Sequence, residues 1–209
     1  MTDESTSRAY LWFDLEFTSL DIEEAAILQL AMLITDVNLR RLESDDGGLC
    51  IHVRPPPDVP VSPWVREHLA GLLLKCDGPS AVAPDAVESL VCDYVDRHMG
   101  SPAPEIDRRP VIAGNSVHMD LFLARRLLPR LIDRCHYRIL DVTSFKLQWE
   151  DWLQGDPFDK DDRDLVKRYF PDASLPAEAG SHDAYYDIQA SIAELSYYRT
   201  HFGRATEAR

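Results

Sequence analysis

The chain has 209 residues with a formal net charge of −14 at pH 7, and 45% of its residues are hydrophobic. This length fits one ordinary domain, and the hydrophobic fraction is sufficient for a complete core. The negative charge argues against an extended basic groove for long nucleic acid, which needs clustered Lys and Arg, but leaves room for a pocket that binds a few nucleotides.

The predicted elements begin with three strands rich in aromatic and apolar residues, over 9–17, 25–36 and 49–54. A Pro-rich loop over 55–63 leads into Trp64. There follow helices near 64–75 and 84–98, a strand at 111–113, a helix that starts near Asp120, a strand at 139–142, and helices at 144–153, 161–169 and 184–201. Such an order predicts an α/β domain with a mixed sheet. We expect this domain to span 9–203, between disordered ends at 1–8 and 204–209.

Two observations bear on the cellular location. No stretch approaches the roughly 18 apolar residues that a membrane helix needs, and the polar start MTDESTSRA lacks the apolar centre of a secretion signal. The four cysteines (Cys50, Cys76, Cys92 and Cys135) form no C-x-x-C pair and have no zinc-like spacing with histidine. We therefore expect reduced thiols in a cytoplasmic protein, rather than a zinc site or a catalytic cysteine.

Two acids interrupt the first predicted strand, AYLWFDLEF. Asp14 and Glu16 lie two residues apart, so their side chains point to the same face of the strand. Neighbouring carboxylates among apolar residues repel each other and lose hydration, and a divalent cation with oxygen ligands removes both penalties. An edge strand whose polar face meets water is the ordinary alternative, and this motif alone does not decide between them.

Two further polar motifs follow. Asp120 ends GNSVHMD near the start of a predicted helix, where capping or helix-dipole chemistry would explain an Asp equally well. His182 and Asp187 are five residues apart in SHDAYYDI, at a loop-to-helix junction where a surface histidine is the ordinary alternative. The specific signal is the combination of D-x-E, a later Asp and H-x₄-D in this order.

This combination resembles the DEDDh exonuclease pattern, and the neighbouring residues sharpen the resemblance to the oligoribonuclease family. DLEFTSL is similar to that family's D-L-E-M-T-G-L, and AGNSVHMD to its G-N-S-x-x-x-D. HYRILDVTSFK is similar to its H-Y-R-Y-L-D-V-S-T-x-K, and HDAYYDIQASIAELSYYRTHF resembles its last helix. The resemblance runs from about residue 9 to 202 and implies a ribonuclease H-like fold, a mixed sheet flanked by helices.

The resemblance implies 3′→5′ hydrolysis of very short RNA to nucleoside monophosphates by a two-metal mechanism. Asp14, Glu16, Asp120 and Asp187 would hold two divalent ions, Mg²⁺ or Mn²⁺, with Asp14 shared between them. His182 would be the general base, because its ordinary pKa of about 6.5 suits proton transfer near neutral pH.

For the bases, the resemblance implies that Leu20 and Trp64 wedge against the rings, since an aromatic face stacks with any base. His68 lies near the position of a family histidine, although its spacing from Trp64 is one residue shorter than expected. Trp64 is equally compatible with a place in the core.

For the other end of the substrate, the resemblance implies that Ser116, Arg138 and Thr143 cap the 5′ phosphate of a dinucleotide. Tyr137 would reach into the site of a partner subunit, so a homodimer is expected. Segment 154–181 departs from the family's sequence and receives no role.

Two other functions remain open from the sequence. A general DEDDh exonuclease would act on longer single-stranded RNA or on DNA ends, and the acidic net charge disfavours it. A non-catalytic module would keep the fold as a scaffold, and five polar groups of catalytic type disfavour that alternative.

Overall fold

The computed structural model describes residues 8–43, 47–176, 180 and 182–207. Within these residues, five strands form one sheet in the order β3-β2-β1-β4-β5. The strands are β1 (Ala9–Phe17), β2 (Ile27–Asp36), β3 (Leu49–His52), β4 (Val111–Gly114) and β5 (Ile139–Asp141). β1, β2 and β3 are antiparallel neighbours, whereas β4 and β5 run parallel to β1. The predicted mixed sheet is therefore confirmed.

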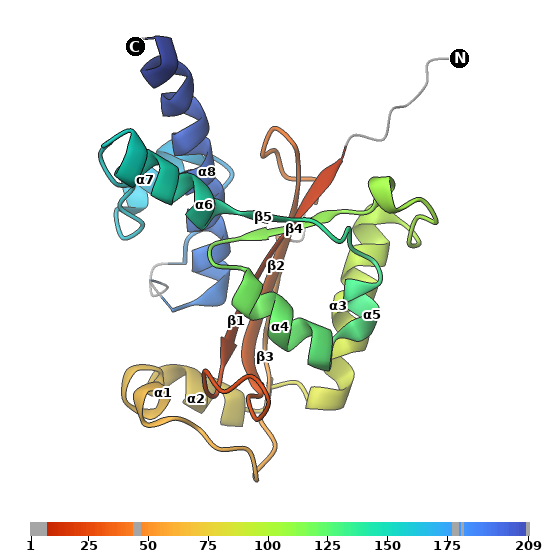
Figure 1. Ribbon diagram of the computed structural model, residues 1–209. Helices are drawn as coiled ribbons and strands as arrows, with labels where there is room; N and C mark the ends of the chain where they lie inside the picture. The colour runs from red at the N-terminus through yellow and green to blue at the C-terminus, as the bar shows by residue number, and fades with distance from the viewer. Residues whose placement is uncertain (1–7, 44–46, 177–179, 181, 208–209) are drawn as a thin grey trace.

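The helices cover both faces of this sheet (Figure 1). They are α1 (Pro63–His68), α2 (Ala70–Asp77), α3 (Pro84–Met99), α4 (His118–Leu127), α5 (Pro129–Ile132), α6 (Val142–Leu147), α7 (Arg163–Tyr169) and α8 (Ala184–Glu207). In Figure 1, α3, α4 and α5 lie on one side of the sheet, and α8 with α6 and α7 on the other. α1 and α2 lie near the end of β1. In the described part of the chain, no helix has the length and hydropathy required for a membrane span.

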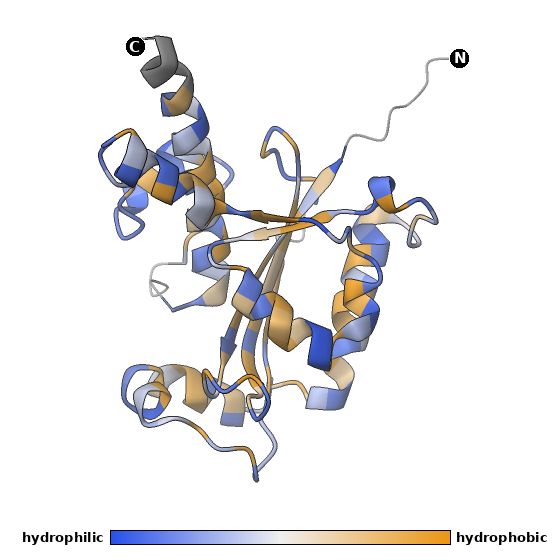
Figure 2. Cartoon of the chain, in the orientation of Figure 1, coloured by the Kyte–Doolittle hydropathy of each residue, from blue (hydrophilic) through white to orange (hydrophobic). Residues whose placement is uncertain are grey.

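Alternation along β1 divides the core into two clusters, because successive side chains of a strand point to opposite faces. Leu11, Phe13 and Leu15 pack with residues of α3, α4 and α5. Trp12 points the other way and packs with residues of α8. Figure 2 shows apolar residues concentrated on the strands and polar residues on many outward helix surfaces. Every second residue after Trp12 therefore belongs to the α8 face.

Three boundaries differ from the sequence prediction. The helix expected over 64–75 is two helices that meet at Leu69, a residue buried with the α1–α2 cluster. The helix expected over 144–153 is α6 followed by a π-helical turn over Gln148–Trp152. α8 continues to Glu207, past the domain end expected at 203, and several good helix formers stand in 204–207. Residues 1–7 and 208–209 of the expected disordered ends lie outside the described residues.

Candidate active site

Three carboxylates from β1 and α8 lie close together. Asp14 and Glu16 lie on the α8 face of β1, and Asp187 lies in the first turn of α8. One oxygen from each of these carboxylates lies within 4.8 Å of the others. Two residues on one strand face and one on the facing helix thus form a compact acidic cluster.

Asp120 reaches the same region from α4. Its Oδ1 accepts a hydrogen bond from the backbone N–H of Leu15 at 2.9 Å, and its side chain is buried. β4 pairs with β1 only as far as Trp12, so no strand hydrogen bond from β4 occupies β1 at Leu15. Asp120 therefore accepts the backbone N–H that β4 leaves without a partner, and this bond holds its carboxylate next to the acidic cluster.

Burial and mutual repulsion raise the pKa values of these acids. Burial raises the pKa of Asp14 well above its ordinary range, and the charges of Asp120, Asp187 and Glu16 raise it further. Burial, followed by the charge of Asp187, raises the pKa of Glu16 to about 8, and burial raises that of Asp120 to about 7. Buried carboxylates with such pKa values need positive charge to ionise at neutral pH, and their oxygens are the ligands that divalent cations prefer. The donor set therefore fits divalent metal ions.

His182 lies between the acids and a neighbouring pocket. Its backbone has φ +67°, a left-handed conformation that costs a non-glycine residue free energy, and its N–H donates to Asp187 Oδ2 at 2.9 Å. Its Nδ1 lies 4.0 Å from Glu16 Oε1, and its side chain is 55% exposed. The ring meets that of Trp64 edge-on, with centroids 5.3 Å apart. The imidazole is therefore accessible, yet beside the carboxylates.

The pocket next to His182 has a volume of about 540 Å³ and is lined in part by Glu16, Leu20 and Trp64. Leu20 is 78% exposed and Trp64 is 47% exposed, so Trp64 is not a core residue. His68 stacks on the Trp64 ring with centroids 4.6 Å apart, and its Nδ1 lies 2.9 Å from the Trp64 carbonyl oxygen. Both predicted wedge residues thus line a pocket that adjoins the acids.

The segment that carries Trp64 is fixed to the end of β1. The N–H of Ser62 donates to the carbonyl oxygen of Thr18 at 2.8 Å. Ser62 also caps α1, because its Oγ accepts from the N–H of Val65. Thr18 in turn accepts from the N–H of Ala26 through its own hydroxyl. These bonds hold the start of α1 against the strand that bears the acids.

Ser116 and Thr143 meet at the end of β4. Ser116 has φ +48°, and its N–H donates to Asp141 Oδ1 at 3.0 Å and to Thr143 Oγ1 at 2.9 Å. The hydroxyls of Ser116 and Thr143 are 3.2 Å apart. Gly114 permits this turn, because a Cβ at that position would lie 2.9 Å from the carbonyl oxygen of Phe13. Two of the three predicted phosphate-cap residues are therefore neighbours.

Arg138 and Tyr137 lie apart from that pair in this single chain. Both side chains are exposed on the loop before β5, and the Arg138 guanidinium lies over the Tyr137 ring, 5.5 Å from its centroid. Among the contacts of the described residues, none joins Arg138 to Ser116 or Thr143. Of the three residues predicted to form a phosphate cap, Ser116 and Thr143 thus lie together and Arg138 lies apart from them.

Sequence reasoning missed the polar residues that lie behind Ser116 and Thr143. Asn115 Nδ2 donates to Ser191 Oγ at 2.9 Å and to Glu194 Oε2 at 2.8 Å. Lys160, from the segment without an assigned role, lies 3.4 Å from the same Glu194 oxygen. Asn115 stands in the G-N-S motif and could have been found there, whereas the spacing of Lys160 gives no such signal.

The five-stranded mixed sheet and the acidic cluster define an exonuclease of the ribonuclease H-like class, and comparison with known proteins agrees. Residues 11–195 match a family described as "Exonuclease". In solved structures, the zinc-bound exonuclease I–single-stranded DNA complex of E. coli has a TM-score of 0.67 at 14% identity, which shows the fold alone. That match covers 97% of this chain and 42% of the other.

Sequence relatives indicate which family of exonucleases this chain belongs to. An oligoribonuclease of Streptomyces coelicolor is 36% identical over 200 residues, which cover 90% of this chain and 84% of the relative. A mitochondrial oligoribonuclease of Homo sapiens is 31% identical over 201 residues, covering 94% and 74%. The chain therefore belongs to the oligoribonuclease family of 3′→5′ exoribonucleases.

Proposed function

We propose that this chain hydrolyses very short RNA, above all 5′-phosphorylated dinucleotides, from the 3′ end to nucleoside monophosphates. The observation that carries the proposal is the pocket of Leu20 and Trp64, which opens directly beside Glu16 and His182. A base held in that pocket brings its phosphodiester to the carboxylates. The acidic net charge and the small pocket together favour a short substrate over a long one.

In this proposal Asp14, Glu16, Asp120 and Asp187 would hold two divalent ions, Mg²⁺ or Mn²⁺. When bound, such ions supply an activated water and stabilise the leaving oxygen. The proximity of three of these carboxylates supports this assignment, as does the burial that raises the pKa of each.

His182 is the proposed general base. The water oxygen bonds to the phosphorus of the last linkage while His182 takes the proton from the water. The bond from phosphorus to the 3′ oxygen of the preceding nucleotide breaks, and that oxygen leaves with the bonding electrons and takes a proton from solvent. The hydrogen bond from its own N–H to Asp187 and the edge contact with Trp64 support this role, because they fix the backbone and the ring. The imidazole must be neutral before the step, so that its ring nitrogen can accept the proton.

At the other end of the substrate, Ser116 and Thr143 offer hydroxyl groups to the 5′ phosphate, and Arg138 adds a charge-assisted contact. His68 stacks behind Trp64 and keeps that ring in position for stacking on a base. We expect these contacts at the 5′ phosphate to limit the substrate to very few nucleotides.

Tyr137 is proposed to act across a homodimer. β5 is an edge strand of the sheet, and exposed apolar side chains gather beside it at Ile106, Tyr137 and Ile139, which line one shallow groove. An unpaired edge with apolar neighbours is a surface that a second copy can cover. Light scattering should give twice 23.8 kDa at micromolar concentration; a fully active protein of monomer mass would contradict the dimer.

The test of the proposed function is a time course on 5′-phosphorylated RNAs of two to seven nucleotides with Mg²⁺ or Mn²⁺. The dinucleotide should be cleaved much faster than the heptamer, and Arg138→Ala should reduce that preference by roughly 10-fold or more, the loss of a charge-assisted hydrogen bond. Equal rates on both lengths would instead favour a general exonuclease. The cytoplasmic location expected from the cysteines, all four of them free, stays a prediction.

A further inference from the structure

The segment after α6 is held against α8 by its backbone. Trp149 Nε1–H donates to the carbonyl oxygen of Asp156 at 2.7 Å, and the hydroxyl of Tyr197 donates to the same oxygen at 3.0 Å. Gly155 lies under the Trp149 ring, where any Cβ would clash with it. Phe158 is buried in the cluster that contains α8. The path of this segment is therefore fixed by packing on the helix that carries Asp187.

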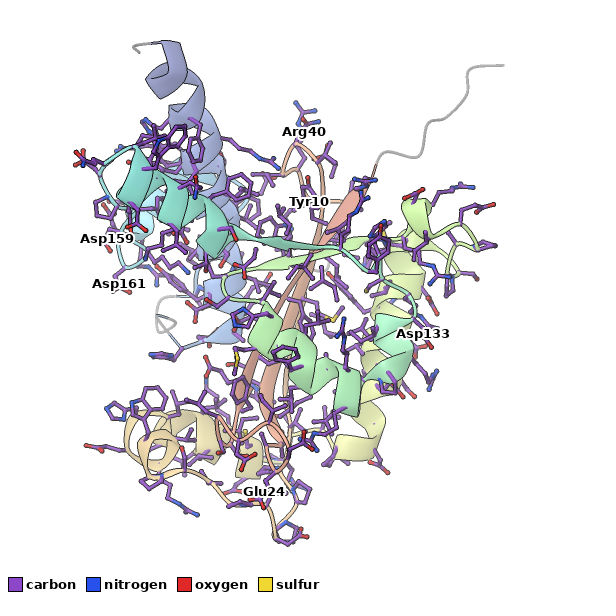
Figure 3. The ribbon with its side chains drawn as sticks, in the orientation of Figure 1. Tyr10, Glu24, Arg40, Asp133, Asp159 and Asp161 are labelled. Atoms are coloured by element: carbon purple, nitrogen blue, oxygen red, sulfur yellow. The ribbon has the colours of Figure 1, made fainter. Side chains whose placement is uncertain are left out.

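Lys160 is the inward-facing member of this segment. Its carbonyl oxygen accepts a hydrogen bond of 2.6 Å from the hydroxyl of Tyr186, the residue before Asp187. Its sequence neighbours Asp159 and Asp161 are exposed on the outer side of the loop (Figure 3). The ammonium group of Lys160 instead lies 3.4 Å from Glu194 Oε2.

Glu194 is a buried carboxylate that needs such a cation. Its side chain is only 1% exposed, and an unpaired charge at that depth is strongly unfavourable. Its Oε1 accepts from the hydroxyl of Tyr198 at 2.7 Å, and its Oε2 accepts from the side-chain amide of Asn115 at 2.8 Å. Lys160 is the cation that the described ion pairs bring to this carboxylate.

From Glu194 the contacts continue to the phosphate cap. Asn115 Oδ1 accepts from the hydroxyl of Thr143 at 3.2 Å, and Thr143 Oγ1 accepts from the N–H of Ser116 at 2.9 Å. Four contacts thus connect Lys160 with Ser116.

We propose that Lys160 is a positioning residue: its ammonium group neutralises Glu194 and thereby holds Asn115, Thr143 and Ser116 in the arrangement that receives the 5′ phosphate. The segment between α6 and α7 thus acquires a role in substrate selection. This inference rests on the proposed dinucleotide hydrolysis. It assigns Lys160 no direct contact with the substrate.

The first test compares Lys160→Met with Lys160→Arg, which keeps the charge, and with Lys167→Met, a matched change on the exposed surface of α7. KM and kcat are measured for RNA dinucleotides with a 5′ phosphate and with a 5′ hydroxyl. Lys160→Met should raise KM for the phosphorylated dinucleotide by about 10-fold and leave the hydroxyl substrate within about 2-fold. Lys160→Arg should restore most of the difference, and Lys167→Met should behave as the wild type.

The second test separates a role through Glu194 from direct binding of phosphate. Glu194→Gln keeps a hydrogen-bonding side chain without the charge, so its partner cation is no longer needed, and a Lys160→Met/Glu194→Gln double variant buries no unpaired charge. If Lys160 acts through Glu194, Lys160→Met should add less than about 2-fold in that background. If the increases in KM from Lys160→Met and Glu194→Gln instead multiply in the double variant, the proposal is overturned and Lys160 contacts the substrate directly.

Two further outcomes also decide. Equal loss on both dinucleotides with a lower melting temperature would reduce Lys160 to a purely structural role and overturn the inference. Unchanged selectivity in Lys160→Met, while the wild type discriminates the two substrates, would overturn it as well. A wild type that cleaves no dinucleotide, or ignores the 5′ phosphate, would instead contradict the proposed function, so the two failures are distinguishable.

Discussion

On one face of β1, Leu11 and Phe13 are buried among the apolar residues of α3, α4 and α5, as the alternation of a strand requires. On the other face, Asp14 and Glu16 stand at the corresponding positions and meet Asp187 of α8. The same strand therefore carries an ordinary core on one side and an electrostatically unfavourable cluster on the other. Burial of the apolar face stabilises the fold, and the clustered acids of the other face destabilise it.

The α8 helix repeats this contrast. Asp187, Ser191 and Glu194 recur at helical spacing and form a polar stripe that faces inward rather than toward solvent. Buried polar groups of this kind are retained only where each finds a partner, and here the partners are Asn115, Lys160 and, in our proposal, metal ions. An inward polar stripe opposite paired strand acids thus marks the functional face.

The largest expected effect comes from neutralising Asp14, one of the carboxylates that we propose hold the two metal ions. Asp14→Asn should abolish measurable hydrolysis, as should removal of divalent ions from the wild type. The same variant should melt at a higher temperature than the wild type in metal-free buffer, because an amide replaces a buried carboxyl group that must take up a proton, or bury a charge beside other acids, when the chain folds. Activity assays and thermal melts check both statements.

The matched change on the opposite face is Leu11→Ala. It should cost about 2–5 kcal/mol of unfolding free energy, as for other buried leucines, yet leave the activity per folded molecule near that of the wild type. A stable Leu11→Ala variant without activity would erase the contrast between the two faces, and so would Asp14→Asn with normal hydrolysis.

The next effect concerns the general base. His182→Ala should lower kcat by roughly 10²–10⁴-fold, the usual range for such a group, while KM for the dinucleotide changes little. Because the imidazole is half-exposed and outside the core, the melting temperature should stay close to that of the wild type. Near-normal kcat would remove His182 from the mechanism.

Local patterns were sufficient to predict most of the fold. The residues of β1 are those of a typical strand, and the apolar residues of α8 recur at helical spacing. The sequence therefore predicted where both elements lie in the chain. The division at Leu69 did not follow from the sequence, because neither Gly nor Pro stands at that position: its backbone leaves the helical region, with φ −114° and ψ 28°, although its side chain is an ordinary buried leucine. The continuation of α8 to Glu207 was missed because Gly203 is a typical stop signal just after the predicted helix, and α8 continues through it.

The site was predictable only through the resemblance. Asp14 and Asp187 are far apart in the sequence, and no spacing rule brings a strand residue beside a distant helix. The left-handed backbone of His182 and the contact of Lys160 with Glu194 depend on tertiary packing. Lys160 stands in an acidic, Pro-rich stretch without periodicity, where a lysine is expected to face solvent, and only the structure turns it inward.

A smaller effect is expected at the base pocket. Trp64→Ala should raise KM for the dinucleotide by about 5- to 150-fold, which corresponds to the loss of one base–aromatic stack, with little change in kcat. Trp152 is also exposed but does not line the pocket, so Trp152→Ala is a matched control that should keep the wild-type KM. Equal effects of the two changes would mean that Trp64 does not stack on a base.

The smallest effect is the pH dependence of metal stabilisation. Burial raises the pKa of Glu16 from 4.5 to about 8 and that of Asp120 from 3.8 to about 7 in the folded chain. The metal-free folded state therefore binds more protons than the unfolded state between those values. It follows that stability is lost as pH rises through about 4 to 8.

Divalent ions bind the deprotonated carboxylates, so the rise in melting temperature on adding Mg²⁺ should be larger at about pH 8.5 than at about pH 6. For a chain of this size each kcal/mol corresponds to about 2–4 °C. Glu16→Gln should flatten the pH dependence of the metal-free protein, because it removes the group with the higher of the two values. An equal rise in melting temperature at both pH values would show that these carboxylates ionise without help from a metal ion. The acidic face of β1 would then need no counterion to stay folded.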